Sequence, residues 1–103
     1  MTLIEFLRLS PGEKENGVWL SGIEGEGEYI QYWSNGHIYK LAHYKDGELH
    51  GEYKDWHGNG QIWEHSYYKK RKYHGECKEW HSNGELYMHS LYRNGIEIKD
   101  YLK

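Results

Sequence analysis

The sequence has little of what builds a thick hydrophobic core. Only 37% of its 103 residues are apolar, it contains one Pro and one Cys, and no stretch approaches the roughly 18 apolar residues of a membrane span. A chain so poor in Leu, Ile and Val cannot fill a deep core, but eleven Tyr and five Trp argue against disorder. A single domain built as a thin sheet faced with Tyr and Trp reconciles the two facts.

The single cysteine and the lack of excess positive charge argue against further classes of protein. The lone Cys77 excludes an internal disulfide and favours a reducing compartment, so we expect a cytoplasmic protein. Residues 1–9 have no basic start, and Glu5 and Arg8 interrupt their apolar run, which argues against a signal peptide. Thirteen Lys and Arg against sixteen Asp and Glu give a net charge of −3, which argues against a general binder of nucleic acid or of acidic membranes.

A 24-residue repeat organises most of the chain. The dipeptide Asn-Gly recurs with this spacing, at Asn35-Gly36, Asn59-Gly60 and Asn83-Gly84. Residues 27–50 and 51–74 share nine identities, and 51–74 and 75–98 share ten, where chance gives about one or two. We therefore divide the single domain into a cap with a degenerate hairpin (1–26), three repeats (27–50, 51–74 and 75–98) and a closing strand (99–103).

Turn signals predict one β-hairpin per repeat. Besides each Asn-Gly, a second signal follows at Asp46-Gly47 and at Asn94-Gly95, and both dipeptides tolerate the positive φ of a type I′ turn. The segments between turns run for about nine to eleven residues and are rich in Tyr, Trp, Ile and His. We expect an all-β fold, an elongated single-layer antiparallel meander of about six or seven strands, stabilised by cross-strand pairs rather than by a deep core.

The edge strands at the two ends of the sheet must be protected from pairing with other chains. A capping-box spacing predicts a short N-terminal helix over 3–9, ended by Ser10-Pro11-Gly12, with a strand as the competing interpretation. At the other end, 96–103 is expected to close the sheet, with Asp100-Tyr101 in the place of Glu52-Tyr53.

Residues 51–60 carry the pattern Gly-Glu-Tyr-x-x-Trp-x-x-Asn-Gly, through which the chain resembles the MORN (membrane occupation and recognition nexus) repeat family. It resembles in particular a variant found in bacterial antitoxin-like proteins and in giant-virus proteins; for a virus, the compartment would be the host cytoplasm. The resemblance covers about 27–101. It implies a hairpin-per-repeat sheet that serves as a scaffold, a dimerisation surface or a partner-binding module, and an antitoxin-like role in which the partner is a toxin.

Residue types that often carry catalysis are present without a catalytic arrangement. Six of the eight His form repeat-related pairs, whose members stand about 9–10 Å apart, too far to share one zinc ion. Acidic residues recur in register and indicate a structural ladder with Lys54 and Lys78, at Glu28, Glu52, Glu76 and Asp100. Cys77 is interpreted as a small side chain on a sheet face. We expect no enzyme, no metal site and no cofactor.

Aromatic side chains form the first candidate surface for a partner. Tyr39, Trp63 and Tyr87 recur 24 residues apart, and strict alternation places them on one face together with Tyr67. Exposed Tyr and Trp are typical of protein-binding hot spots, although plain stacking within the sheet explains the row equally well. We expect a non-catalytic protein–protein interaction or scaffold module, which binds an unknown protein or a second copy of itself as a homodimer.

A basic hairpin tip forms the second candidate surface. Lys69, Lys70, Arg71 and Lys72 stand where the other units have Asp-Gly or Asn-Gly. Without Gly, the turn either widens or takes strain. Nucleic-acid or lipid-headgroup binding through this tip is the alternative function, and a solvated loop is the plain interpretation.

Overall fold

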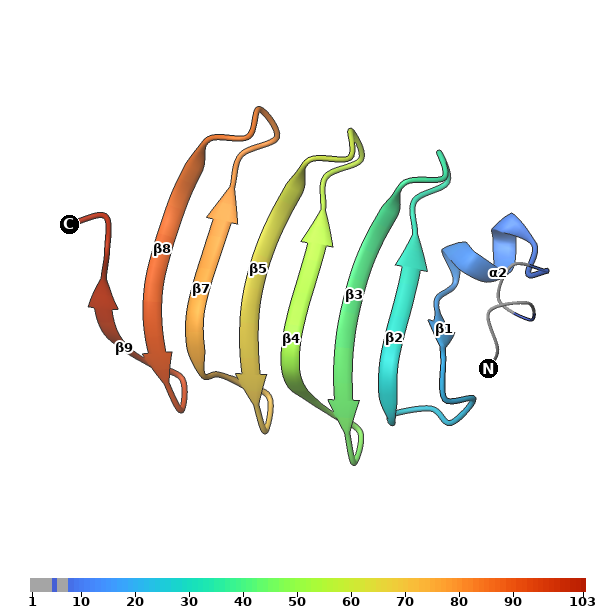
Figure 1. Ribbon diagram of the computed structural model, residues 1–103, viewed down its shortest axis with the longest axis horizontal. Coiled ribbons are helices and arrows are strands. Elements are labelled where there is room, and N and C mark those ends of the chain that lie inside the picture. The colour runs from blue at the N-terminus through green and yellow to red at the C-terminus, as the bar shows by residue number, and fades with distance from the viewer. Residues whose placement is uncertain (1–4, 6–7) are drawn as a thin grey trace.

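The computed structural model describes Glu5 and residues 8–103, and it confirms the all-β fold: these residues form one open antiparallel sheet of nine strands with one short helix. The elements are α2 (Pro11–Glu15), β1 (Val18–Trp19), β2 (Gly27–Tyr32), β3 (Ile38–Lys45), β4 (Glu48–Trp56), β5 (Ile62–Lys69), β6 (Lys72–Tyr73), β7 (Gly75–Trp80), β8 (Leu86–Arg93) and β9 (Ile96–Asp100). The sheet is a single layer with extents of 46 × 34 × 17 Å, and its strands follow chain order from right to left in Figure 1. Only β6 lies off this order, and it pairs with β5.

The turns at the lower ends of the strands in Figure 1 are those that the sequence predicts. Asp46 and Asn94 have φ values of 52° and 49°, and the glycines that follow them have φ values of 78° and 83°. Both central residues of each turn are therefore left-handed, as a type I′ hairpin turn requires.

The Asn-Gly loops at the upper ends of the strands differ from the prediction. In the first of them only Gly36 has a positive φ, 91°, and its N–H donates to Trp33 O at 3.0 Å. The Asn35 side chain accepts instead, from the backbone N–H of His37 at 2.9 Å. The same bonds recur in the next two units. These are longer loops in which Asn acts as an acceptor and Gly alone is left-handed.

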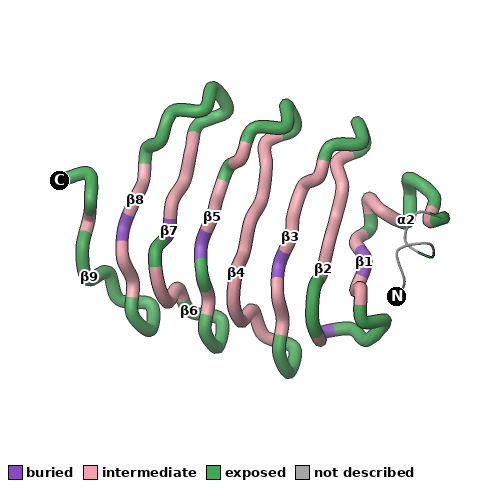
Figure 2. Tube along the Cα trace, in the orientation of Figure 1, coloured by how far each residue is buried: buried purple, intermediate pink, exposed green. Residues whose placement is uncertain are grey.

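The centre of the sheet is a row of small buried side chains. Ala42, Ser66, Cys77 and Ser90, one on each of β3, β5, β7 and β8, are at most 2% exposed (Figure 2). A chain of ring contacts lies on the same face, with centroids 5.6, 4.9 and 5.0 Å apart, through Tyr53, Tyr68, Tyr73 and Tyr92. We call this side of the sheet the tyrosine face. The core is thin, so cross-strand pairs of about 0.2–1 kcal/mol each contribute much of the stability.

Helix α2 begins where the sequence analysis expected a helix to end. Ser10 caps it: Ser10 Oγ accepts the Glu13 N–H at 3.2 Å, and the Glu13 carboxylate accepts the Ser10 N–H at 3.3 Å. Pro11 fits the start of a helix because its missing N–H would have no partner there. Ser10-Pro11-Gly12 therefore begins a helix that the sequence analysis did not predict.

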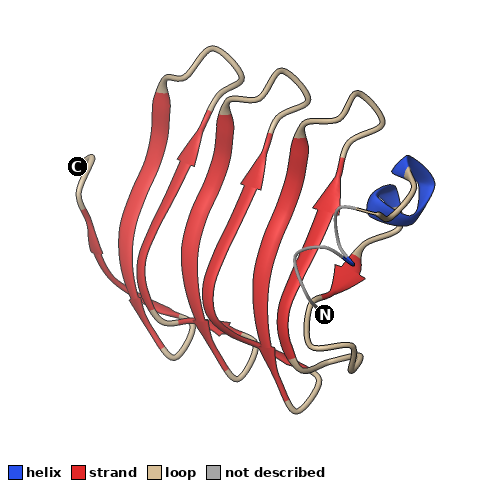
Figure 3. Cartoon of the chain, turned by 45° about the vertical axis from the view of Figure 1, so that its right-hand side comes forward, coloured by secondary structure: helices blue, strands red, loops and turns tan. Residues whose placement is uncertain are grey.

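The N-terminal end of the sheet is covered by α2, which packs against β2 (Figure 3). The side-chain amide of Gln31 on β2 donates to Glu15 O at 2.8 Å. Most of the helix expected over 3–9 lies outside the described residues, and it stays a prediction.

At the other end, β9 pairs one residue out of the predicted register. Gly51 has a φ of 107° in the irregularity that precedes the pairing of Tyr53 with Ala42. The corresponding residue of β9 is Lys99, which does not adopt a positive φ. Asp100, rather than Tyr101, therefore lies opposite Ser90. A one-residue slip reverses the faces of the side chains, so the expected match of Asp100-Tyr101 to Glu52-Tyr53 is wrong in space.

Candidate functional site

Three of the four aromatic residues singled out in the sequence, Tyr39, Trp63 and Tyr87, lie in β-bulges near the upper ends of the strands. In β5, Trp63 is an extra residue with no partner opposite it on β4. Tyr39 in β3 and Tyr87 in β8 are extra residues in the same way. A bulge re-aims the side chain that it adds, and the strict alternation used in the sequence analysis does not detect it.

We call Tyr39, Trp63 and Tyr87 the aromatic band. Each of its rings packs on a ring of the preceding loop, Tyr39 on Trp33 at 4.3 Å, Trp63 on His57 at 4.5 Å and Tyr87 on His81 at 4.3 Å between centroids. Trp63 and Tyr87 nevertheless stay 40% and 42% exposed. The band is thus held from one side and accessible from the other, as hot-spot side chains are.

The aromatic band and a row of carboxylates share the tyrosine face. Glu79 lies two residues from the buried Cys77 along β7, so both point to this face. Tyr87 lies against Glu79 and Trp63: burial, followed by the Glu79 carboxylate, raises the pKa of the Tyr87 hydroxyl. The exposed rings therefore border negatively charged oxygens.

Asp55, Glu64 and Glu79 make up this carboxylate row, and they occupy directly opposed positions on β4, β5 and β7. Like charges in such positions repel each other. Burial, together with the neighbouring Glu79, raises the pKa of Glu64 to about 7, and burial also raises the pKa of Asp55. Ser66 Oγ donates to Glu64 at 2.7 Å, and the Tyr53 hydroxyl donates to Asp55 at 3.1 Å. Glu64 consequently titrates near neutral pH in the folded chain.

The sequence analysis did not identify the carboxylate row, although part of its signal was present. Asp55 and Glu79 are 24 residues apart and therefore occupy equivalent repeat positions. Glu64 has Lys40 and Met88 as its repeat counterparts, so no periodic signal marks it. Its place between the two other carboxylates follows only from the strand register.

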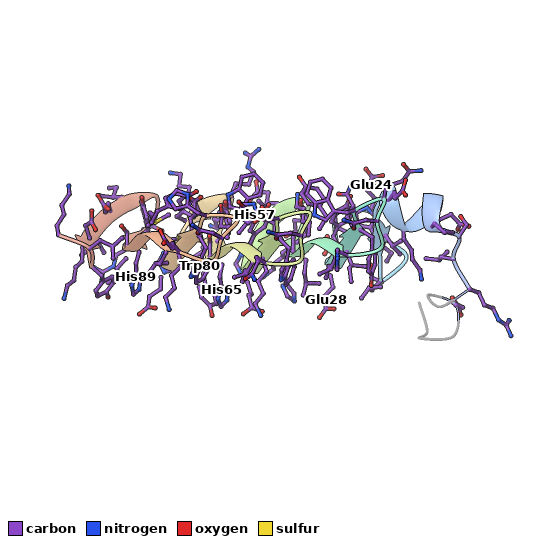
Figure 4. All side chains as sticks on the ribbon, turned by 90° about the horizontal axis from the view of Figure 1, so that it is seen from above. Glu24, Glu28, His57, His65, Trp80 and His89 are labelled. Carbon is purple, nitrogen blue, oxygen red and sulfur yellow. The ribbon has the colours of Figure 1, made fainter. Side chains whose placement is uncertain are left out.

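The opposite side of the sheet, which we call the histidine face, carries three of the four predicted ladder residues, Glu28, Glu52 and Glu76. The fourth, Asp100, lies opposite Ser90 and therefore on the tyrosine face, so its place in the ladder is wrong. The ion pairs of the histidine face are Glu28–His43 at 3.4 Å, Glu52–His65 at 2.9 Å and Glu76–His89 at 3.6 Å. Figure 4 shows Glu28, His65 and His89 on one side of the sheet. Histidine, rather than the expected lysine, supplies most partners; the hydrogen bond from His65 lowers the pKa of Glu52, and Lys54 lies 3.9 Å from that carboxylate.

Tyr67 lies on the histidine face, away from the aromatic band. It pairs across the strands with Glu52, and its ring centroid lies 5.4 Å from that of His65. The expected grouping of Tyr67 with Trp63 is therefore wrong. The bulge at Trp63 separates the two residues, because it breaks the alternation that placed them together.

The basic tip, Lys69–Lys72, keeps a tight turn instead of widening. Lys70 and Arg71 have φ values of 50° and 68°, so two non-glycine residues take the strain of the type I′ turn. The Arg71 N–H donates to Leu49 O at 3.0 Å, and Arg71 Nε lies 3.6 Å from Glu48 Oε1. On its β4 side the positive charge of the tip is thus partly neutralised by the neighbouring hairpin.

The described residues place no three His, Cys, Asp or Glu side chains where they could hold a metal ion. Burial raises the pKa of the Cys77 thiol, which disfavours the nucleophilic thiolate. In the same part of the chain, no helix is long and apolar enough to cross a membrane. The aromatic band and the basic tip remain the candidate surfaces.

Comparison with known families and proteins agrees with the repeat. The family model of a MORN repeat variant matches three segments, residues 25–46, 49–70 and 73–94. These segments follow the 24-residue period and take in well over half of the chain. Searches of curated proteins and of solved structures gave no match.

Proposed function

Because the chain belongs to the MORN repeat variant family, we propose that it is a non-catalytic binding module that holds a basic segment of a protein partner on its aromatic band. MORN repeats suggest a binding or scaffold module, and the family is generally non-catalytic. The fold itself names no partner, so the proposal depends on the surface.

The observation that carries the proposal is the combination of exposed rings with carboxylates on one face. Trp63 and Tyr87 are 40% and 42% exposed, and Glu64 and Glu79 lie beside them. A Lys or Arg side chain is attracted by the face of an aromatic ring and by a carboxylate. Charge complementarity therefore favours a partner segment that carries Lys or Arg.

Capture from a lysate of the natural host tests this proposal. We expect the tagged protein to retain one stoichiometric protein after nuclease treatment, Trp63→Ala to lose it, and Tyr67→Ala on the histidine face to keep it. Both variants remove a similarly exposed ring, which makes them a matched pair. Retention by Trp63→Ala would place the binding surface elsewhere.

The identity of the partner and the location of the protein are proposed on fewer observations. A toxin is the partner that the resemblance to antitoxin-like proteins suggests, and a second copy of the chain is the partner that an open sheet suggests. A cytoplasmic location is proposed from the single cysteine alone. Identification of the captured protein by mass spectrometry distinguishes a toxin from a second copy of the chain.

One observation favours a second candidate, the binding of nucleic acid or lipid headgroups through the basic tip. Lys70 and Arg71 hold left-handed backbone conformations that the two sister turns give to Asp-Gly and Asn-Gly. Strain of this kind often accompanies function. Binding by this route would weaken steeply with added salt and disappear when Lys69 to Lys72 are replaced by Ala; salt-tolerant binding would contradict it.

A further inference from the structure

Hydrogen bonds between the upper loops join each repeat to the next. Trp33 Nε1 donates to Trp56 O at 3.0 Å, and Asn35 Nδ2 donates to Gly58 O at 2.7 Å. The two donors belong to one loop, and the two carbonyls that accept from them are two residues apart on the next unit. This pair of bonds is a side-chain clamp on the end of an extended strand.

The second junction repeats the clamp 24 residues later. His57 Nε2 donates to Trp80 O at 2.9 Å, and Asn59 Nδ2 donates to Ser82 O at 2.8 Å. The donors change from Trp to His at the first position, but the carbonyls are again two residues apart. The clamp is therefore a property of the repeat junction rather than of one loop.

The third unit has equivalent side-chain donors, but no carbonyl in the described chain accepts from them. His81 and Asn83 stand 24 residues after His57 and Asn59, and among the described residues no carbonyl accepts from their side chains. His81 is exposed, whereas His57 is half-buried. Leu86, at the start of β8, is also exposed, at 40%.

Strand β9 does not extend to the upper end of β8, where His81 and Asn83 lie. It pairs with β8 from Arg93 to Ser90, and the chain then turns at Tyr101, whose N–H donates to His89 O at 2.9 Å. Figure 1 shows β9 beside the lower part of β8 only. Within the described chain, the edge of β8 from Leu86 to Met88 thus faces no neighbouring strand on that side.

We propose that this upper edge of β8, together with the His81 and Asn83 side chains, accepts an extended strand from a partner protein, in the place that the first strand of a further repeat would take. Strand addition of this kind draws its affinity from backbone hydrogen bonds. The strand offers two carbonyls two residues apart to the clamp. This site goes beyond the proposed function, because it uses an edge of the sheet and not the aromatic band.

Continuity with the existing junctions determines what kind of strand fits. At the junction of β5 with β7, Glu64 lies opposite Glu79. Met88 takes the place of Glu64 in β8, so an incoming strand with an acidic residue at the Glu79 position meets a thioether instead of a second carboxylate. In a second copy, β3, β4, β5 and β7 lie between two neighbours, whereas β1, β9 and the upper part of β8 keep a free edge. We commit to a segment of another protein as the occupant, since it can supply a strand as long as those that the clamp holds, β4 with nine residues and β7 with six.

A synthetic peptide that copies residues 51–60 tests the proposal, because its Trp56 and Gly58 carbonyls are the ones that accept at the first junction. Titrated into the full ¹⁵N-labelled chain, it is expected to shift the backbone amide signals of 81–89 and to leave those of β2 and β3 in place. A peptide with Asp55→Pro, which breaks the extended backbone, is expected not to bind.

Asn83→Asp is the decisive variant. Asn83 Oδ1 accepts the Glu85 N–H at 2.9 Å, and Asp keeps this acceptor while it removes the Nδ2 donor. We expect a roughly fivefold loss of peptide affinity with an unchanged melting temperature. His81→Phe, which keeps a ring against Tyr87, is expected to lose affinity similarly. Trp63→Ala is expected to bind the peptide normally, which separates this site from the aromatic band.

Three results would overturn the proposal. They are the absence of shifts at millimolar peptide, unchanged affinity in both clamp variants, and shifts of 81–89 that follow protein concentration without peptide. The last result would mean that a second copy occupies the edge.

Discussion

At the scale of single residues, Glu64 makes stability depend on pH. Its pKa is raised from 4.5 to about 7 in the folded chain, by burial and by Glu79. The folded state then holds a proton that the unfolded state loses between these two values. The free energy of unfolding should therefore fall as pH rises through this window, and the penalty should be complete above pH 7.

Glu64→Gln removes this penalty while it keeps an oxygen to accept from Ser66. Because the site is partly exposed to solvent, we expect a stabilisation of about 1–2 kcal/mol at pH 8 and almost none at pH 4. Urea unfolding of both proteins at the two pH values measures the difference. An equal effect at both values would show that Glu64 does not keep a proton in the folded state.

Arg71 is a second residue whose effect can be isolated. Its φ of 68° is costly for a residue with a Cβ, so Arg71→Gly should stabilise the protein by about 1 kcal/mol. The exposed contact with Glu48 that is lost is worth little. Gly47→Ala is the reciprocal control: its φ is 78° and no atom lies within 4 Å of the added Cβ, so the backbone alone should destabilise it. A neutral or destabilising Arg71→Gly would contradict the assigned strain.

At the scale of elements, Lys99 decides how the last strand pairs. Lys99→Gly restores the residue type that Gly51 and Gly75 supply, at φ values of 107° and 123°. We expect β9 to shift by one residue and bring Tyr101, instead of Asp100, opposite Ser90. Cross-strand nuclear Overhauser effects from Ser90 would report the new partner, and an unchanged contact with Asp100 would show that another cause sets the register.

The type of each element could be predicted from the sequence more reliably than its side-chain directions. Asp46-Gly47 and Asn94-Gly95 predict tight turns because few dipeptides tolerate two left-handed residues. The bulge at Trp63 could not be predicted, because an extra residue alters pairing without altering the sequence period. The start of α2 could have been found, since Ser10 and Glu13 have capping-box spacing around Pro11.

At the scale of the whole molecule, contacts between successive repeats stabilise a sheet that has only a thin hydrophobic core. The strands contact mainly their neighbours in the sheet, and the most buried side chains are small ones. An architecture of this kind can be predicted from a period of 24 residues, because each unit must cover the next. The site could be predicted only in part: the residues of the aromatic band repeat, but the carboxylates beside it come together through strand register.

The central claim is that the tyrosine face, at its aromatic band, holds the partner. The most direct measurement is the dissociation constant of the captured partner for the wild type, Trp63→Ala and Tyr67→Ala, which alter opposite faces of one sheet. The account predicts that Trp63→Ala weakens binding by about 2 kcal/mol and that Tyr67→Ala leaves it within about 0.5 kcal/mol. The reverse order, or equal losses, would contradict it.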